Sequence, residues 1–525
     1  MPKQAPKITY TTLFADESVH PKFEAALKKF KPRMGERHPM HIGGKKVWSE
    51  EGEFEVRSPS DTSVVVGSFQ RGTRKDAKEA VQAAEEGFGK WSSTSWERRV
   101  AVMEKFASLV DERKFDIAVA ISYEVGKNRL EALAECWESM DAVRYYAKKM
   151  REEKGYTSRM GGGGPGEHCV VAAKPHGVWP VISPFNFPFM LASGMALGAL
   201  VTGNAVVLKP TSAAPLTGLM LYTAYNDAGV PAGAVNYVTG PGPNFEDEFV
   251  TNPGVAGIAF TGSRDVGMKI YRRFLSEQPF PKPIVLEMGS KNPTIVTAKA
   301  DMEKAVEGTV RAAFGYGGQK CSATSRVYVQ ESVKGVFLRD LKERVERLTV
   351  GDPTAKGTFM GPVINRAAVA KFEAAVSEAR KAGGKVVAGG SVLKGRGISK
   401  GYFVEPTVVA DLPEGNRLLR DELFLPFVAV QGVGSVEDAI DEANATEYGL
   451  TAGIFSEDKR EVKKFFDGIH FGVVYANRSG GSTTGAWPGA QSFTGWNASG
   501  ATGRGVGSPH YLLNFLRDQS LTTVS

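Results

Sequence analysis

Apolar residues in the first part of the chain recur at the spacing of amphipathic helices. This periodicity predicts surface helices over residues 22–33 and 74–88 and a further helix that starts at Trp96. The apolar positions along that third helix are Val102, Phe106, Leu109 and Val110. A glycine-rich run over residues 161–166 then breaks the pattern. It predicts a turn or flexible tip, which could join the two strands of a long hairpin.

From Gly177 onward the pattern changes to short apolar runs that alternate with helical segments. The first set predicts strands over residues 177–183, 205–208, 234–238 and 255–260, with helices near 188–202 and 213–228. The second set predicts strands near residues 293–297, 326–330 and 425–432, with helices near 303–313, 333–347 and 366–382. Such alternation is typical of β-α-β units around a parallel sheet, so the sequence predicts two α/β domains in tandem.

Two segments allow more than one interpretation. The apolar run 187–208 is interrupted by Pro188, Asn204 and three glycines, which favours a core helix and a buried strand over a membrane span. Residues 479–510 are rich in glycine, serine and threonine, a composition typical of a linker. The segment also contains aromatic residues that linkers usually lack, so a binding loop is a competing interpretation. These aromatic residues are Trp487, Phe493 and Trp496.

Composition narrows the class of protein. The chain has 525 residues, of which 42% are hydrophobic and 23% charged, as in a globular protein of two or three domains. Its 65 basic and 58 acidic residues are mixed along the chain, and the net charge of +7 fits a small anionic ligand better than a nucleic acid. The first twenty residues hold no apolar signal segment, and the three cysteines form neither a disulfide framework nor a metal-binding pattern. We therefore expect a cytoplasmic protein without a metal or a membrane span.

Cys321 is the first candidate for chemistry. It lies in a glycine-rich loop, residues 317–326, that we expect to lead into a helix. Free N–H groups at a helix start, together with Lys320 and Arg326, could lower the pKa of the thiol. On this local pattern alone a buried structural cysteine is the favoured alternative.

Glu287 is the candidate base that could act with this thiol. The chain has no histidine between His176 and His470, which makes a cysteine–histidine hydrolase a weaker hypothesis. Glu287 ends a strand-like apolar run, where burial would raise its pKa and suit it to proton transfer. A structural ion pair is an equally good interpretation of this residue by itself.

A nucleotide site is indicated only weakly by the glycines. The usual Gly-x-Gly-x-x-Gly fingerprint does not follow any predicted strand. The segment 260–267 does follow one, and its glycines open a helix whose N-terminus could bind a pyrophosphate. An ordinary strand-to-helix turn explains the segment equally well.

Taken together, these segments resemble the aldehyde dehydrogenase superfamily over about residues 38–520. The matching motifs, in order, are Pro184-Phe185-Asn186-Phe187-Pro188, Lys209-Pro210, the segment 260–267, Glu287-Met288-Gly289 and Gly318-Gln319-Lys320-Cys321. Glu287 and Cys321 are 34 residues apart, which also matches the family.

The resemblance implies an aldehyde dehydrogenase-like α/β fold with two tandem Rossmann-like domains and a small β element for oligomerisation. Residues 1–154 and 174–286 would form the dinucleotide-binding domain, residues 287–498 the catalytic domain, and residues 155–173 and 499–525 the oligomerisation element. A homodimer or a multiple of dimers follows from such an element.

The resemblance also implies the roles of the catalytic residues. Cys321 would attack the aldehyde carbonyl, Asn186 would stabilise the oxyanion with the Cys321 backbone N–H, and Glu287 would activate water to hydrolyse the thioester. The residues implied for the cofactor are Ser183, Pro184, Phe185, Lys209, Ser212, Gly262, Ser263, Val266, Glu422 and Phe424.

Two positions in the cofactor region depart from the family pattern. NAD-preferring members usually carry glutamate where this chain has Ser212. Loss of that carboxylate removes its repulsion of a 2′-phosphate, so we expect NADP to be preferred and NAD to be possible. Leu425 stands where the family usually has glycine.

Within the superfamily, the sequence is most similar to the L-glutamate γ-semialdehyde (1-pyrroline-5-carboxylate) dehydrogenases, which act in proline catabolism. This resemblance implies that substrate and a set of substrate-binding residues, namely Phe187, Ser322, Gly481, Ser482 and Phe493. The loop around Trp487 is about four residues longer than in the group. Two alternatives stay open: a general aliphatic or aromatic aldehyde dehydrogenase, and a non-redox cysteine thioester hydrolase or acyltransferase.

Overall fold

The computed structural model describes residues 16–395, 397–480 and 488–525, and it contains two large mixed sheets. The first has seven strands in the order β12-β11-β8-β9-β10-β2-β3. Its parallel strands are β12 (Ile284–Glu287), β11 (Ile258–Thr261), β8 (Val178–Ser183), β9 (Ala205–Pro210) and β10 (Val235–Tyr237). At one edge, β2 (Met40–Ile42) and β3 (Lys45–Val47) continue the sheet in antiparallel orientation.

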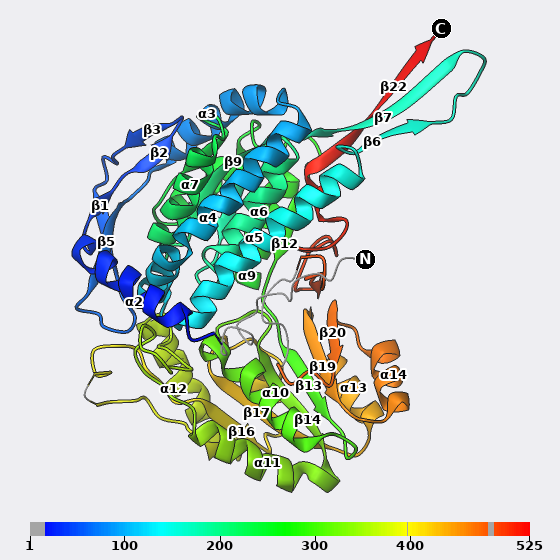
Figure 1. The fold of residues 1–525 in the computed structure, drawn as a ribbon. Coiled ribbons are helices and arrows are strands. Elements are labelled where there is room, and N and C mark those ends of the chain that lie inside the picture. The colour runs from blue at the N-terminus through cyan, green and yellow to red at the C-terminus, as the bar shows by residue number, and fades with distance from the viewer. Residues whose placement is uncertain (1–15, 396, 481–487) are drawn as a thin grey trace.

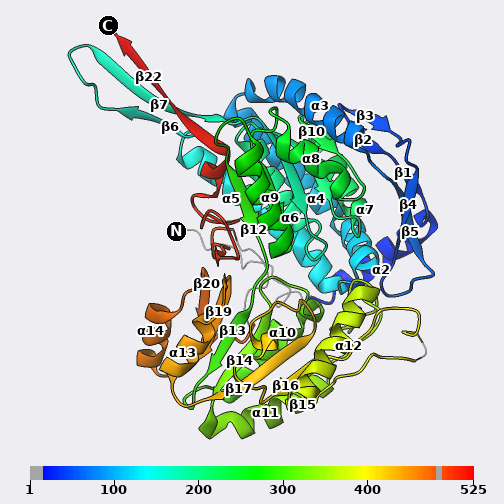
Figure 2. The same cartoon turned by 180° about the vertical axis from the view of Figure 1, so that it is seen from behind.

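Helices cover both faces of this first sheet (Figures 1 and 2). On one face lie α4 (Trp96–Val125), α5 (Arg129–Glu152), α6 (Met190–Val201) and α7 (Pro215–Ala228). On the other lie α3 (Arg74–Ser92), α8 (Pro243–Thr251) and α9 (Arg264–Glu277). Val206 and Leu208 of β9 pack into the first layer, whereas Ala205 and Val207 pack into the second. The apolar run 205–208 is therefore continuous because both faces of the strand are buried.

The second sheet has seven strands in the order β15-β16-β17-β14-β13-β19-β20, all parallel except the β15–β16 pair. Its strands are β13 (Asn292–Val296), β14 (Thr324–Gln330), β15 (Lys385–Ala388), β16 (Thr407–Ala410), β17 (Phe427–Val433), β19 (Thr451–Phe455) and β20 (Val473–Ala476). Its helices are α10 (Met302–Phe314), α11 (Glu331–Glu346), α12 (Arg366–Lys381), α13 (Val436–Asn444) and α14 (Lys459–Gly468). The two α/β units predicted from the alternating pattern are confirmed.

A smaller three-stranded sheet projects from the body as an arm (Figure 1). We call it the arm throughout; its strands are β6 (Thr157–Met160), β7 (Glu167–Pro175) and β22 (Leu516–Val524). β6 and β7 form an antiparallel hairpin across the glycine-rich turn, as the sequence predicted. β22 pairs antiparallel with β7 along its whole length, so the C-terminal residues become part of the arm. The domain ranges inferred from the resemblance stay a prediction.

The remaining elements are short strands, one helix and 3-10 turns, half of them near the N-terminus. They are α2 (Val19–Phe30), β1 (Arg37–His38), β4 (Glu53–Arg57), β5 (Val65–Gln70), β18 (Tyr448–Gly449) and β21 (Trp496–Asn497), with short 3-10 turns at Lys31–Arg33, Gly315–Gly318, Arg417–Leu419 and Tyr511–Phe515. The sequence analysis did not predict α5. Its buried face carries acidic residues, so hydrophobic periodicity could not reveal it.

Candidate active site

An elongated pocket of about 510 Å³ lies where the carboxyl ends of β8, β9 and β11 face residues of the second α/β unit. Ligands of open α/β sheets bind at this end of the strands. All ten residues predicted for the cofactor line the pocket, together with Asn186 and Cys321. Lining residues that the sequence analysis missed are Ile182, Thr211, Gly242, Phe260, Thr261, Met288, Gly289 and Lys371.

The N-termini of two helices lie at this pocket. Gly242 precedes α8 and Ser263 precedes α9, and neither residue makes a side-chain capping bond. The first N–H groups of a helix lack partners within the helix and favour an anion such as a pyrophosphate. The segment 260–267 is thus a strand-to-helix turn that opens onto the pocket, which distinguishes it from an ordinary turn.

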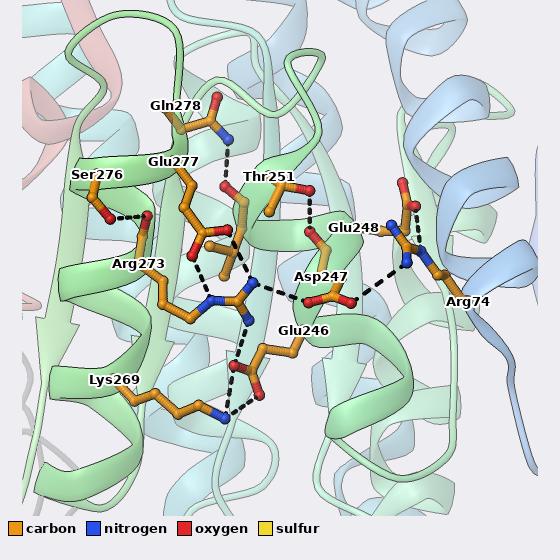
Figure 3. A network of polar contacts seen from close by, with 11 residues as sticks. Arg74, Glu246, Asp247, Glu248, Thr251, Lys269, Arg273, Ser276, Glu277 and Gln278 are labelled. Atoms are coloured by element: carbon orange, nitrogen blue, oxygen red, sulfur yellow. Dashed lines mark hydrogen bonds and ion pairs between the residues drawn. The ribbon is translucent and has the colours of Figure 1, made fainter.

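Ion pairs connect these two helices to each other (Figure 3). Arg273 of α9 reaches Glu246 at 2.7 Å and Asp247 at 3.0 Å on α8. Arg74 of α3 extends the network to Glu248 at 3.0 Å. The helix starts that line the pocket therefore belong to one connected layer.

Lys209 and Ser212 lie in the part of the pocket where the sequence departs from the NAD pattern. Lys209 is buried, and burial lowers the pKa of its ammonium group to about 8. Its Nζ donates to the Pro210 carbonyl oxygen at 3.2 Å, and the Ser212 hydroxyl donates to the Gly240 carbonyl oxygen at 3.1 Å. The only acidic residue among the described lining residues is Glu422.

Glu422 is held by main-chain and lysine contacts. Its Oε1 accepts a hydrogen bond from the Ser290 N–H at 2.7 Å, and its carbonyl oxygen accepts one from Lys371 Nζ at 3.1 Å. Burial raises the pKa of its carboxyl group. A side chain at Gly289 would collide with this carboxylate, which explains the glycine there. Leu425 does not line this pocket; its side chain is buried in a hydrophobic cluster of the second unit.

The surroundings of Cys321 correct two expectations. The loop follows α10 and a 3-10 turn, Gly315–Gly318, and leads into strand β14 rather than a helix. Lys320 Nζ donates a hydrogen bond to the Glu131 carboxylate at 2.6 Å. The Arg326 guanidinium donates to the main-chain oxygens of Lys291 and Ala443. These bonds direct both cations to partners other than the thiol.

Burial raises the pKa of the Cys321 thiol to about 12, and the charges of Glu287 and Glu422 add to this shift. The prediction of a lowered thiol pKa was therefore wrong for this state of the protein. The main chain at Cys321 is firmly held, because its carbonyl oxygen accepts hydrogen bonds from Ser290 and from Asn292 Nδ2. Cys321 lines the pocket, where part of the residue stays exposed.

Glu287 ends strand β12, as expected, and is buried. Its carboxyl group accepts a hydrogen bond from the Gly495 N–H, while Oε2 has no hydrogen-bond partner among the described residues. Burial raises the pKa of this carboxyl group well above its ordinary value. A buried carboxyl group with a free oxygen, close enough to raise the pKa of the thiol, can transfer a proton near Cys321.

The described part of the 479–510 segment packs against the end of β12. The Met288 N–H donates to the Ser499 oxygen at 2.9 Å, and the Ala501 N–H donates to the Leu286 oxygen at 3.2 Å. Residues 488–510 are therefore not a free linker. The predictions for Gly481, Ser482 and Trp487 lie outside the described residues.

The other predicted substrate residues within the described part of the chain are buried. Phe187 and Phe493 belong to the same hydrophobic cluster, and Cys321 packs against it. Ser322 is also buried, and its carbonyl oxygen accepts a hydrogen bond from the Thr451 hydroxyl at 3.2 Å.

Glu138 is a buried acid that the sequence analysis missed. Neither of its carboxylate oxygens has a hydrogen-bond partner among the described residues, and burial raises its pKa well above the ordinary value. It lies on one face of α5 with Glu131 and Glu135. Acids spaced three and four residues apart were the available signal in the sequence.

The fold and the site define a class of α/β enzyme in which a cysteine lines the same pocket as the N-termini of two helices. The model of the aldehyde dehydrogenase family matches residues 47–521, so the chain belongs to that family of oxidoreductases. No helix in the described residues is long and apolar enough to cross a membrane. Those residues also contain no group of three or more acidic, histidine or cysteine side chains that could hold a metal ion.

Named relatives include both NAD-bound and NADP-dependent proteins. The 1-pyrroline-5-carboxylate dehydrogenase of Bacillus cytotoxicus is 38% identical over 98% of this chain and 97% of its own. The solved 1-pyrroline-5-carboxylate dehydrogenase from Thermus with bound NAD is 33% identical, with a TM-score of 0.93 over 99% of this chain and 98% of that one. An NADP-dependent enzyme of E. coli is 29% identical, with a TM-score of 0.86 over 93% and 98%.

Proposed function

We propose that this protein oxidises L-glutamate γ-semialdehyde to the corresponding carboxylate with a nicotinamide dinucleotide. The observation that carries the proposal is the single pocket lined by Cys321, Asn186 and all ten residues predicted for the cofactor. The names of the relatives support the substrate, since the similarity extends over nearly the whole of each chain.

The residues of the pocket fit a dinucleotide. The uncapped starts of α8 and α9 suit a pyrophosphate, and the carboxylate of Glu422 suits the hydroxyl groups of a ribose. Phe424 and Phe185, whose rings lie 5.8 Å apart edge to face, offer apolar surface for a nicotinamide ring. The bound nucleotide would supply the hydride acceptor for the oxidation.

The residues of the chain perform the remaining chemistry. After Glu287 accepts its proton and passes it on to solvent, Cys321 forms a carbon–sulfur bond to the aldehyde carbon, and the carbonyl oxygen becomes an oxyanion. The Asn186 amide and the Cys321 N–H donate hydrogen bonds to that oxygen. Loss of hydride from the carbon leaves a thioester. Glu287 then takes a proton from water, the hydroxide attacks the thioester, and the carbon–sulfur bond breaks to release the carboxylate.

The buried carboxyl group of Glu138 is a reason to expect an ammonium group on the substrate. Burial keeps this carboxyl group protonated while it has no partner among the described residues, and a cation that meets it would favour its ionised form. L-Glutamate γ-semialdehyde carries an α-ammonium and an α-carboxylate group. We assign Glu138 to the ammonium group and Ser322, with Gly481 and Ser482, to the carboxylate. Phe187 and Phe493 would enclose the aliphatic chain between the two ends.

We infer that NADP is the preferred nucleotide and that NAD is also accepted. Ser212 brings no negative charge to the pocket. The pKa of Lys209 is about 8, so its ammonium group keeps its positive charge at pH 7. Both features favour a 2′-phosphate. The Thermus relative with bound NAD supports acceptance of the second nucleotide.

We also propose that the protein is a homodimer or a multiple of dimers, formed through the arm. β22 is an edge strand with exposed apolar side chains, and such edges are usually paired or covered. A cytoplasmic location stays a prediction; the three cysteines, all free, are consistent with it.

The test of the proposed function compares aldehydes with each nucleotide. Reduced nucleotide is measured by absorbance with L-glutamate γ-semialdehyde, hexanal or benzaldehyde, and with NAD or NADP. We expect kcat/KM for the semialdehyde to exceed the others by about 100-fold, or about 2.7 kcal/mol. Preference for the uncharged aldehydes would instead indicate a general aldehyde dehydrogenase.

Cys321→Ala is the control for the chemistry in this experiment. It should abolish aldehyde oxidation and leave nucleotide binding intact, because Cys321 supplies the nucleophile. Turnover by this variant would contradict the assignment of the nucleophile. Thioester hydrolysis by a wild-type protein that binds no nucleotide would favour the non-redox alternative.

A further inference from the structure

Helix α5 carries three buried acids on the face that points toward the active site. Glu131, Glu135 and Glu138 are spaced four and three residues apart, so they lie on one side of the helix. All three are less than one-tenth exposed. Buried carboxylates need partners, and the partners of the first two are the loops that carry the catalytic residues.

Glu135 holds the loop that carries Asn186. Its Oε2 accepts hydrogen bonds from the N–H groups of Phe189 and Met190, both at 3.1 Å, where α6 begins. Its Oε1 accepts one from Lys127 Nζ at 2.5 Å, in a pair with no solvent exposure. The Nζ of Lys127 also lies 3.6 Å from the centre of the Phe187 ring, next to Asn186 in the chain.

Glu131 holds the loop that carries Cys321. Its Oε1 accepts a hydrogen bond from Lys320 Nζ at 2.6 Å, and its Oε2 accepts one from the Tyr316 N–H at 3.2 Å. Tyr316 has a φ of 49°, a left-handed conformation that is unfavourable for tyrosine. The bond from Glu131 therefore helps to keep this strained turn in place before the nucleophile.

We propose that Glu131 and Glu135 are positioning residues that make α5 the common frame of the oxyanion site. Glu135 sets the place of the Asn186 amide, and Glu131 sets the place of the Cys321 thiol and N–H. The inference rests on the proposed function, because it assumes that Asn186 and Cys321 bind the same oxyanion.

The separation of the two oxyanion donors must be kept within narrow limits. An oxyanion donor works only when it lies about 2.7–3.1 Å from the developing charge. The two donors come from segments 135 residues apart in the chain, at positions 186 and 321. One rigid helix that holds both loops one turn apart fixes their separation, whereas the loops by themselves would not.

A double-mutant cycle tests the part assigned to Glu135. The variants are Glu135→Gln, Asn186→Ala and the two combined, with kcat measured at saturating nucleotide and aldehyde. We expect Glu135→Gln to lower kcat by about tenfold or more, since loss of an oxyanion donor costs about 10²–10³-fold. In the Asn186→Ala background the same change should cost less than about twofold, because there is no amide left to position. An equal loss in both backgrounds would overturn the proposal.

Alkylation of Cys321 by iodoacetamide tests the part assigned to Glu131, and it needs no catalysis. Glu131→Gln loosens the loop that holds the nucleophile, so alkylation at pH 8 should be at least about threefold faster. Glu135→Gln should change it by less than about twofold. If both variants altered alkylation and kcat alike, general damage would explain the results and the proposal would fall.

Glu124 provides a matched control. It is also fully buried, and it accepts hydrogen bonds from the Leu216 and Thr217 N–H groups at the start of α7. Glu124→Gln should lower the Tm about as much as Glu135→Gln and leave kcat at saturating nucleotide unchanged. A comparable loss of kcat in this control would show that capping alone matters and would overturn the proposal.

The test stays decisive if a variant fails to fold or if the wild-type protein oxidises no aldehyde. If Glu135→Gln does not fold, Glu135→Asp replaces it in the double-mutant cycle. Aspartate keeps the ion pair with Lys127, but its shorter side chain extends less far toward the start of α6. If the wild type oxidises no aldehyde, the proposed function fails. The alkylation experiment still tests the role of Glu131 in that case. Failure of the proposed function can therefore be distinguished from failure of the positioning role.

Discussion

At the scale of single residues, the nucleotide preference that we propose depends on the region around Lys209 and Ser212. The Ser212 hydroxyl is engaged with the Gly240 carbonyl oxygen and brings no charge. Lys209 is buried, and its pKa of about 8 means that it becomes neutral as the pH rises through 8. Attraction for a 2′-phosphate is therefore greatest below that pH and declines above it.

Ser212→Glu should shift the preference from NADP toward NAD. The new carboxylate repels a 2′-phosphate and can bind the ribose hydroxyls, so the NADP:NAD ratio of kcat/KM at pH 7 should fall at least about tenfold, or about 1.4 kcal/mol. Ser212→Ala is the control: it removes the bond to Gly240 without adding charge and should leave the ratio nearly unchanged. An unaltered ratio in Ser212→Glu would mean that the 2′-phosphate is bound elsewhere.

At the scale of elements, the ion pairs between α8 and α9 stabilise the layer behind the pocket. Arg273 pairs with Glu246, Asp247 and Glu277, and its side chain is 27% exposed (Figure 3). Isolated surface pairs contribute little, but a guanidinium shared by three carboxylates has the geometry of a network. Figure 3 shows that the same network continues through Asp247 to Arg74.

Arg273→Met should lower the free energy of unfolding by about 1–2 kcal/mol at low salt. The difference from the wild type should shrink in about 1 M salt, where the Debye length is about 3 Å. Arg460→Met is the matched control, because among the described residues Arg460 forms an ion pair with Asp458 alone, and its side chain is 87% exposed. Denaturant unfolding measures both variants. A salt-independent loss for Arg273→Met would contradict the electrostatic explanation.

At the scale of the whole molecule, two α/β units meet at one pocket while the arm extends away from both (Figures 1 and 2). The arm buries little within the chain: every residue of β22 after Leu516 is exposed. Leu521 and Val524 are 44% and 72% exposed, and Met160 of β6 is 57% exposed. A long edge strand with apolar side chains is stable in solution when another surface covers it.

Leu521→Lys combined with Val524→Lys should therefore weaken the dimer that we propose. Charges on this edge oppose burial against a second copy, so light scattering after size exclusion should show a shift toward monomer at micromolar concentration. Phe466→Lys is the control, because Phe466 is 46% exposed on α14, away from the arm. An unchanged mass for the double variant would place the interface elsewhere.

Much of the fold after residue 177 could be predicted from the sequence, for a specific reason. Strands such as β9 are buried on both faces, so their apolar runs are unbroken and easy to recognise. Four of the five motifs found by resemblance lie at the carboxyl ends of strands and the fifth, the Cys321 loop, precedes β14; every predicted cofactor residue lines the same pocket. Helix α5 escaped prediction because its buried positions include acids, whose partners come from distant parts of the chain.

The sequence by itself determined the two alternating α/β units, the candidate residues Cys321, Glu287 and Asn186, and the order of the nucleotide motifs. Only the tertiary structure decided which charges face one another. Lys320 is next to Cys321 in the chain, yet it pairs with Glu131, and burial together with the charges of Glu287 and Glu422 raises the thiol pKa. The physical reason is that periodicity and motifs report a residue's own segment, whereas burial and pairing depend on side chains that folding brings together from far along the chain.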